Sequence, residues 1–279
     1  MPPILSEGAR TVKIMTILVT GATGNIGRLV VDHLNGLGAN DIRALTKNPA
    51  KANLPDEVAA ITGYLGDPET LPAALEGVER MYLAPFPPTL DVTLELAEKA
   101  GVQYVVALSG GAHWQEYTDT IAVSGLVNTQ LGPGEFLENF AMWSEPIMAS
   151  RTVREPYPGM VEAPISMSDI ARVAATLLVK PEQTHFGQMY ELTGPEALTR
   201  AQIAEQIGVG IGAEVRFEKC GLDEARDRLR PVMGDEVDWY LELMKDAEPQ
   251  QANQLVAELT GTPAESVARW AARNAELFR

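Results

Sequence analysis

Three glycines at a regular spacing give the first indication of chemistry in this sequence. Residues 20–27 read TGATGNIG, which places Gly21, Gly24 and Gly27 three residues apart. The β-rich run TILVT precedes them and apolar residues at helical spacing follow, so a strand, a tight turn and a helix are expected. Such a turn presents backbone amides and a helix N-terminus to a pyrophosphate. The usual fingerprint is G-x-G-x-x-G, so a purely structural turn stays open as the alternative, and nucleotide binding is favoured. The residues expected to contact the nucleotide in this turn are Gly21, Thr23, Gly24, Asn25, Ile26 and Gly27.

The end of the second expected strand indicates which dinucleotide binds. NAD sites carry an Asp or Glu at this point, which binds the ribose hydroxyls. The strand IRAL ends instead in Thr46 and Lys47, and Asp41 lies at its opposite end. A hydroxyl and a cation suit a 2′-phosphate, so NADPH is expected in preference to NADH, with a merely solvated lysine as the alternative. The other expected cofactor contacts follow later strands and are Asp67 at an adenine edge, and Ala84, Pro85, Phe86, Leu108 and Ser109 along the groove.

The composition of the chain argues against several kinds of binding partner and bound group. The chain has 279 residues, of which 46% are hydrophobic, enough to form one large domain or two small ones, and its net charge is −16. An acidic chain repels nucleic acid and anionic membranes, so neither is expected as a partner. The single cysteine, Cys220, excludes an internal disulfide and fits a cytoplasmic protein. The scattered His33, His113 and His185 have no metal-site spacing, so no metal is expected.

The elements that must position these residues alternate along the chain. Short β runs and amphipathic helices in alternation predict an α/β fold with a doubly wound parallel sheet. Strands are expected at 16–20, 42–46, 58–62, 80–84 and 102–108, and helices at 26–38, 68–76 and 89–100.

The rhythm changes after about residue 150, which predicts a second, smaller and mostly helical part. A helix over 168–179 is expected to be capped by Ser168 or Asp169. A second helix is expected at 199–208, with strands at 188–192 and 213–218. The expected organisation is a poorly structured extension at 1–14 before a start at Met15, a dinucleotide-binding domain at 15–155, and a substrate part at 156–279 with some segments returning to the sheet.

Several segments together resemble a known family. TILVTGATGNIG, IRALTKNP, GVQYVVALS, GPGEFLENF, ISMSDIARVAATLL and YELTGPEALTRAQIA are similar to segments of the NmrA-like, atypical short-chain dehydrogenase/reductases. The resemblance runs from about Met15 to the C terminus. It implies an NAD(P)-binding Rossmann fold in which GPGEFLENF walls the nicotinamide site. The family includes quinone and ketone reductases, other reductases and non-catalytic redox sensors, so the resemblance leaves the chemistry open.

The acid–base residues of the wider superfamily are incomplete in this chain. Ordinary members use a Ser, a Tyr and a Lys four residues after the Tyr. Ser109 resembles that serine in position, but Tyr117 is followed four residues later by isoleucine, and no Lys or Arg occurs between Lys99 and Arg151. An unassisted tyrosine keeps a pKa of about 10 and is a poor acid–base group at neutral pH. Ser109, Tyr117 and His113 are the catalytic candidates, each with a capping or solvated side chain as the alternative.

Aromatic residues are frequent between residues 82 and 157 and suggest a pocket for a flat substrate. The residues expected to line it are Trp114, Phe136, Phe140 and Trp143, with ordinary core packing as the alternative.

These observations predict an NADPH-dependent reductase. Its substrate is expected to be a ketone or quinone of a bulky, aromatic or polyketide-like compound, reduced without an essential protein acid. The alternative is a non-catalytic, NADP-binding regulator that senses redox state. A sugar epimerase is disfavoured because the Tyr–Lys pair is missing. A homodimer is left open.

Overall fold

The computed structural model describes residues 15–110 and 114–279, and the expectations for residues 1–14 and for His113 lie outside this part of the chain. A seven-stranded sheet has the order β3-β2-β1-β4-β5-β6-β9, with every neighbouring pair parallel. The order reverses between β1 and β4, which confirms the doubly wound sheet and puts a ligand crevice beyond the carboxyl ends of these strands. The strands are β1 Thr16–Val19, β2 Asp41–Thr46, β3 Ala59–Thr62, β4 Arg80–Leu83, β5 Tyr104–Leu108, β6 Asn128–Pro133 and β9 Met189–Leu192.

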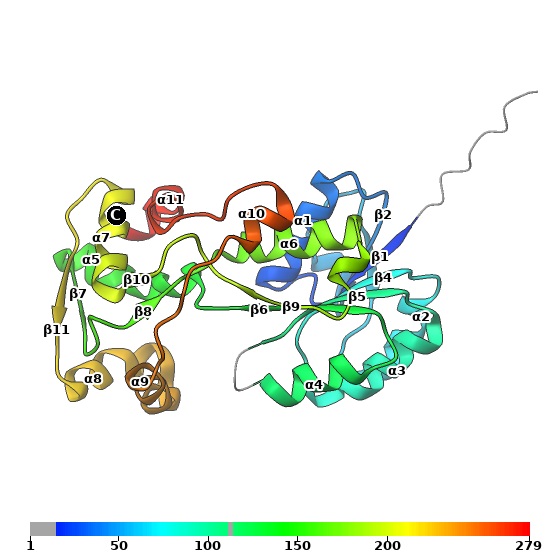
Figure 1. Ribbon diagram of the computed structural model, residues 1–279, viewed down its shortest axis with the longest axis horizontal. Helices are drawn as coiled ribbons and strands as arrows, with labels where there is room; N and C mark the ends of the chain where they lie inside the picture. Colours follow the sequence, from blue (N-terminus) through cyan, green and yellow to red (C-terminus); the bar gives the residue numbers. More distant parts are fainter. Residues whose placement is uncertain (1–14, 111–113) are drawn as a thin grey trace, which may run out of the picture.

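Helices cover both faces of this sheet (Figure 1). One layer contains α1 Asn25–Gly36, α6 Met167–Val179 and α10 Leu255–Thr260, and the other contains α2 Leu71–Leu75, α3 Leu90–Ala100 and α4 Gln115–Val123. Successive residues of β1 face opposite layers: Ile17 and Val19 pack under α1 and α6, and Leu18 packs on the α2–α4 side. Across residues 15–110 and 114–279, none of the helices has the length and apolar character needed to cross a bilayer.

A smaller lobe lies at the end of the sheet from which β6 and β9 point outward (Figure 1). Its core joins Leu137, Phe140 and Val153 to Ile207 and Trp270, so segments on both sides of residue 155 share it. Two short sheets stiffen it: β7 pairs with β11 in parallel, and β8 pairs with β10 in antiparallel. Its elements are η5 Leu137–Trp143, α5 Ser144–Ser150, β7 Thr152–Glu155, β8 Val161–Glu162, β10 Leu198–Thr199, α7 Arg200–Ile211, β11 Arg216–Lys219, α8 Leu222–Met233, α9 Val237–Lys245, α11 Val267–Arg273 and η8 Ala275–Phe278.

Strand β6 is the main element that the sequence patterns missed. It is an interior strand, yet Asn128, Thr129 and Gln130 are polar and buried. Their side chains are hydrogen-bonded: Asn128 Nδ2 donates to the Ile121 carbonyl at 3.2 Å, and Gln130 Nε2 donates to the Thr118 carbonyl at 3.0 Å. These bonds offset the cost of burying amides, which an apolar-run criterion does not register.

The helix expected at 168–179 begins one residue earlier, at Met167. Its N-cap is Ser166, whose hydroxyl accepts from the Asp169 amide at 3.0 Å. Capping by Ser168 or Asp169 was therefore a wrong expectation, because both residues lie inside the first turn. The Asp169 carboxylate binds Arg172 and the Glu265 amide instead.

Candidate functional site

The glycine turn has a shape that only glycine permits. Gly21 has φ +59°, and a Cβ on Gly27 would lie 2.1 Å from the Gly21 carbonyl oxygen. Gly24 caps α1 without any side-chain hydrogen bond, and the first turn of α1 contains no acidic residue. The amides of this helix N-terminus are therefore left for an external acceptor. The turn fits a pyrophosphate by its close approach, its amides and its helix dipole.

Thr20 fixes the turn against the neighbouring strand at the point where the strand order reverses. Its hydroxyl donates to the Tyr82 carbonyl at 3.0 Å and accepts from the Ala84 amide at 2.8 Å. A Cβ on Gly21 would lie 2.8 Å from the Ala84 Cβ. The end of β4 therefore lies directly beside the glycine turn.

A cavity of about 390 Å³, which we call the cofactor pocket, opens beside this turn. Four loops contribute to it, one after each of β1, β2, β3 and β4. No Asp or Glu occurs among the described residues that line it, so nothing in it resembles the acidic ribose ligand of NAD sites. The lining residues are Gly21, Thr23, Leu45, Thr46, Lys47, Asn48, Lys51, Ala52, Gly63, Tyr64, Leu65, Ala84, Pro85 and Phe86.

Two lysines and an aromatic pair give the cofactor pocket its chemistry. Lys47 Nζ lies 3.6 Å from the centroid of the Tyr64 ring, and that ring meets Phe86 edge-on with centroids 5.4 Å apart. Lys51 follows on the turn η1 Pro49–Lys51 and lines the same cavity. Lys51 and Tyr64 were missed by the sequence reasoning. The available signal for Lys51 was its spacing of four from Lys47 in KNPAK.

Some expected cofactor contacts lie outside this pocket. Asp67 is exposed, is absent from the pocket lining, and its carbonyl accepts from the Thr70 hydroxyl at 2.6 Å. Of the loop after β3, Tyr64 and Leu65 line the cofactor pocket, and Asp67 does not. Ile26 and Gly27 are buried in α1.

Gly24 and Asn25 line a second opening, of about 540 Å³, on the other side of the turn. Thr23 lines both this opening and the cofactor pocket. Charged Arg28 and Glu138 and apolar Met167 also line the opening. The Glu138 carboxylate accepts from the Met167 amide at 3.0 Å. The smaller lobe therefore reaches the helix N-terminus where a phosphate would bind.

A third cavity, which we call the inter-lobe cleft, encloses about 780 Å³ at the ends of β5, β6 and β9. Gly110 has φ +94°, and a Cβ there would lie 2.3 Å from the Gly132 Cα, so the two strand ends approach closely. No aromatic side chain occurs among the described residues that line the cleft. The lining residues are Gly110, Gln115, Thr118, Gly132, Pro133, Gly134, Met189, Glu191, Leu192, Thr193, Glu248, Pro249, Gln250 and Gln251.

The hydroxyls expected for catalysis are already constrained. Ser109 is buried, and its hydroxyl donates its proton to Gln130 Oε1 at 2.8 Å, so it offers only lone pairs to a ligand. Tyr117 lies on α4 with its side chain buried, and its hydroxyl has no hydrogen-bond partner among the described residues. Burial raises the pKa of Tyr117 well above its usual value. Leu108 is buried in the sheet core.

The expected aromatic wall does not assemble at one place. Phe140 and Trp143 are buried in the smaller lobe, with ring centroids 4.8 Å apart. Phe136 is half-buried at the end of β6, where it forms a bridge to Ile165. Trp114 precedes α4, is 36% exposed, and packs edge-on against Tyr117.

A buried ion cluster explains the position of two of these aromatic rings. Arg200 is 1% exposed and donates to Glu155 at 2.8 Å, to Glu162 at 3.0 Å and to the Tyr240 hydroxyl at 3.1 Å. Trp143 Nε1 donates to the same Glu155 carboxylate at 2.6 Å. The Arg200 guanidinium also lies 5.1 Å from the centroid of the Trp143 ring. Trp143 therefore completes a polar core, which its aromatic type alone did not indicate.

Glu135 adds a further carboxylate to this cluster, next to the cleft residue Gly134. Burial, reinforced by the negative charge of Glu162, raises the pKa of Glu135 to about 7. One of its oxygens accepts from Asn139 Nδ2 at 3.0 Å. Glu135 is thus a carboxyl group that titrates near neutral pH.

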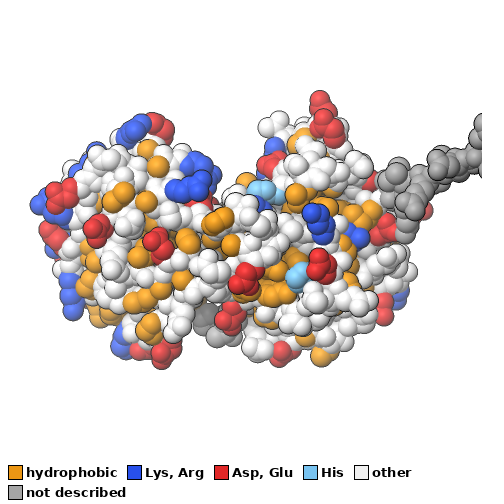
Figure 2. Space-filling model, turned by 45° about the horizontal axis from the view of Figure 1, so that its top comes forward, with side chains coloured by type: hydrophobic (Ala, Val, Ile, Leu, Met, Phe, Trp, Pro, Cys, Tyr) orange, Lys and Arg blue, Asp and Glu red, His pale blue; other side chains and the backbone are white. Residues whose placement is uncertain are grey.

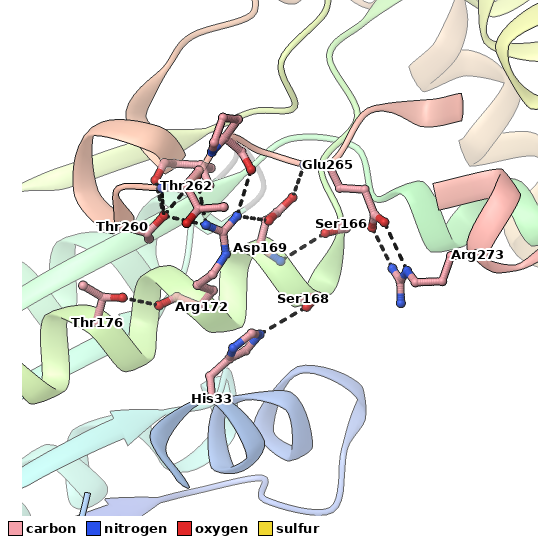
Figure 3. Close-up of polar contacts among 12 residues, drawn as sticks. His33, Ser166, Ser168, Asp169, Arg172, Thr176, Thr260, Thr262, Glu265 and Arg273 are labelled. Carbon is pink, nitrogen blue, oxygen red and sulfur yellow. Dashed lines mark hydrogen bonds and ion pairs between the residues drawn. The ribbon is translucent and has the colours of Figure 1, made fainter. Parts of the chain in front are cut away.

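A second network fastens the C-terminal segment to α6 (Figure 3). Arg172 binds Asp169 and donates to Thr260 Oγ1 at 2.6 Å, and Asp169 Oδ2 accepts from the Glu265 amide at 2.7 Å. Glu265 in turn pairs with Arg273 of α11 at 2.6 Å. Met167 at the start of α6 lines the opening at the glycine turn, so this network joins the C-terminal segment to the helix that borders that opening.

Comparisons with known proteins bear on the fold and on the type of cofactor. A family profile described as NAD(P)H-binding matches residues 21–126. The chain is 30% identical to a (4-alkanoyl-5-oxo-2,5-dihydrofuran-3-yl)methyl phosphate reductase of Streptomyces griseus, covering 94% of this chain and 99% of that protein. It is 32% identical to an NAD(P)H azoreductase of Xenophilus azovorans, again over 94% and 99%. In fold it is similar to an NADPH-dependent quinone oxidoreductase of Escherichia coli solved with NADPH, with a TM-score of 0.81, 24% identity, and coverage of 93% of this chain and 100% of that one.

Proposed function

This chain belongs to the NmrA-like family of atypical short-chain dehydrogenase/reductases and is an NAD(P)H-dependent oxidoreductase, and from that premise we propose that it is an NADPH-dependent reductase of conjugated ketones or quinones. The observation that carries the NADPH preference is the cofactor pocket. Thr46, Lys47 and Lys51 line it without any carboxylate among its described lining residues, and a cationic, hydroxyl-bearing wall suits a 2′-phosphate.

The chain's own residues bind and orient rather than exchange protons. The cofactor supplies hydride when it is bound. The glycine turn and α1 hold its phosphates, and the inter-lobe cleft at the ends of β5 and β6 holds the acceptor. Ser109 directs its proton to Gln130, and the Tyr117 hydroxyl is buried, so neither is assigned as the acid. A conjugated acceptor needs no strong acid, because its own oxygen can be protonated by water from the open cleft.

The size of the cleft supports a bulky acceptor, since about 780 Å³ is within the range of small-molecule sites. A strictly aromatic substrate has less support, because no aromatic side chain occurs among the described lining residues. The proposal therefore concerns conjugation and size rather than aromatic stacking.

Calorimetric titration with NADPH, NADP⁺, NADH and NAD⁺ tests the cofactor assignment first. Tight binding of NADPH together with loss of NADPH absorbance on adding a neutral naphthoquinone supports the proposal. A strong preference for NADP⁺ over NADPH, with no acceptor reduced, contradicts it and indicates a sensor of oxidised cofactor instead.

A further inference from the structure

The inter-lobe cleft has a rigid outer wall. Residues 248–253 connect the α9 region to α10 and are bound to both lobes. The Gln250 amide donates to the Val161 carbonyl at 3.1 Å, and the Gln250 side chain accepts from the Ala163 amide at 3.0 Å. The Asn253 amide donates to Thr193 Oγ1 at 2.8 Å, and its side chain donates to the Glu191 carbonyl at 2.7 Å. The backbone of this wall is therefore hydrogen-bonded to each lobe at Gln250 and Asn253.

The charge of the cleft is of one sign. Glu191 lies on β9 of the sheet and Glu248 lies on the outer wall, and both are exposed to solvent. They are the ionisable groups among the described lining residues, and no Lys, Arg or His accompanies them. Acidic side chains are also visible at the waist between the lobes in Figure 2. The remaining polar groups are neutral amides and hydroxyls, such as those of Gln115 and Thr118.

We propose that the inter-lobe cleft selects conjugated acceptors that are neutral or positively charged and rejects acceptors that carry a sulfonate, phosphate or carboxylate. The inference rests on the proposed reductase function and narrows its substrate class. Two carboxylates that line one concave site raise the local concentration of a cation and lower that of an anion. The surrounding amides bind carbonyl oxygens without preference for charge.

Three acceptors that share one naphthoquinone ring test this inference. One carries an uncharged group, one a trimethylammonium and one a sulfonate, each on the same saturated tether so that the ring chemistry is unchanged. At low salt, kcat/KM for the cationic acceptor is expected to exceed that for the anionic one by roughly tenfold or more. The ratio is expected to fall as salt is added, because exposed charges are screened.

Variants locate the origin of the selectivity. In the double variant Glu191→Gln with Glu248→Gln, the ratio is expected to fall to within about threefold of unity. Glu205→Gln combined with Glu214→Gln, both on the α7 side of the smaller lobe, changes the net charge by the same amount and is expected to leave the ratio unchanged. An equal fall in both double variants would assign the effect to net charge and overturn the inference, as would a ratio near unity in the unmodified protein.

A binding measurement separates this inference from the proposed function. Redox-inert naphthalenes with the same three tethers can be titrated calorimetrically into the protein holding NADP⁺. If no acceptor is reduced, the reductase proposal fails, and tighter binding of the cationic naphthalene still supports the charge selectivity. If all acceptors are reduced equally and all naphthalenes bind equally, the reductase proposal stands and the selectivity is refuted.

Discussion

The cofactor pocket and the inter-lobe cleft lie along the same edge of one sheet, yet they carry opposite charge. Lys47 and Lys51 line the first, and Glu191 and Glu248 line the second. The chain as a whole has a net charge of −16, so a basic pocket requires local placement of cations. Under the proposed functions, this difference would let one acidic protein attract a polyanion at one end of its crevice and keep a second anion out of the other.

The largest effect is expected from Gly27→Ala, which alters the glycine turn proposed to hold the cofactor phosphates. The added Cβ would lie 2.1 Å from the Gly21 carbonyl oxygen, so the turn must move. Because the displaced turn no longer presents its amides in this geometry, the NADPH affinity is expected to fall about a hundredfold, equivalent to roughly 3 kcal/mol of binding free energy and measurable by calorimetry. Gly36→Ala on the same helix is the control, because a Cβ there meets nothing within 4 Å. Equal affinities in the two variants would refute the role of the turn.

The next largest effect concerns the basic end. Lys47→Ala is expected to weaken NADPH roughly tenfold and NADH by less than about twofold, since only NADPH has the 2′-phosphate that a charged hydrogen bond would hold. Lys51→Ala is expected to act in the same direction. Dissociation constants for both cofactors provide the measurement, with the exposed Lys180→Ala as control. Equal losses for NADPH and NADH would remove the cofactor assignment.

A smaller effect is expected behind the acidic end, at Glu135. Its folded-state pKa of about 7 lies above the ordinary value of 4.5, so the unfolded state binds fewer protons between these values and stability falls as pH rises through this window. Glu135→Gln keeps an acceptor for Asn139 and lacks this loss. The free energy of unfolding of Glu135→Gln minus that of the unmodified protein should therefore increase by about 2 kcal/mol from about pH 5 to about pH 8. Urea unfolding at both pH values tests this, and a pH-independent difference would contradict the assigned titration.

The smallest effect is expected from Tyr117→Phe. The hydroxyl is buried, has no hydrogen-bond partner among the described residues, and has a raised pKa, so its removal should change kcat by less than about threefold. Steady-state rates with the neutral naphthoquinone provide the measurement. A loss of about a thousandfold would instead restore the tyrosine as a general acid and weaken the contrast between a binding cleft and a catalytic one.

Elements specified by residues close together in the sequence were predicted correctly, and features that depend on residues far apart in the sequence were missed. Strand β1, the glycine turn and α1 are adjacent in sequence, so their apolar spacing and glycines predicted them directly. Strand β6 has buried polar side chains satisfied by partners on other elements, and apolar patterning missed it. Ser109 was placed correctly at the end of β5, but its bond to Gln130 depends on the missed strand.

Residue type alone did not decide the roles of individual side chains. Phe140 and Trp143 were expected in a substrate wall, whereas they lie in the core of the smaller lobe, where Arg200 contacts both rings. Arg200 arrives from a helix distant in sequence from both aromatic residues, so no spacing could connect them.

By itself, the sequence determined the doubly wound sheet, the glycine turn and the cationic end of β2, because each depends on residues within a few positions of one another. Only the tertiary structure decided that Lys51 and Tyr64 share a pocket with Lys47, and that Glu191 and Glu248 face one cleft. Those groupings require loops from separate strands to meet at one sheet edge. The physical reason is that a parallel sheet gathers the carboxyl ends of distant segments, and this gathering leaves no periodic trace along the chain.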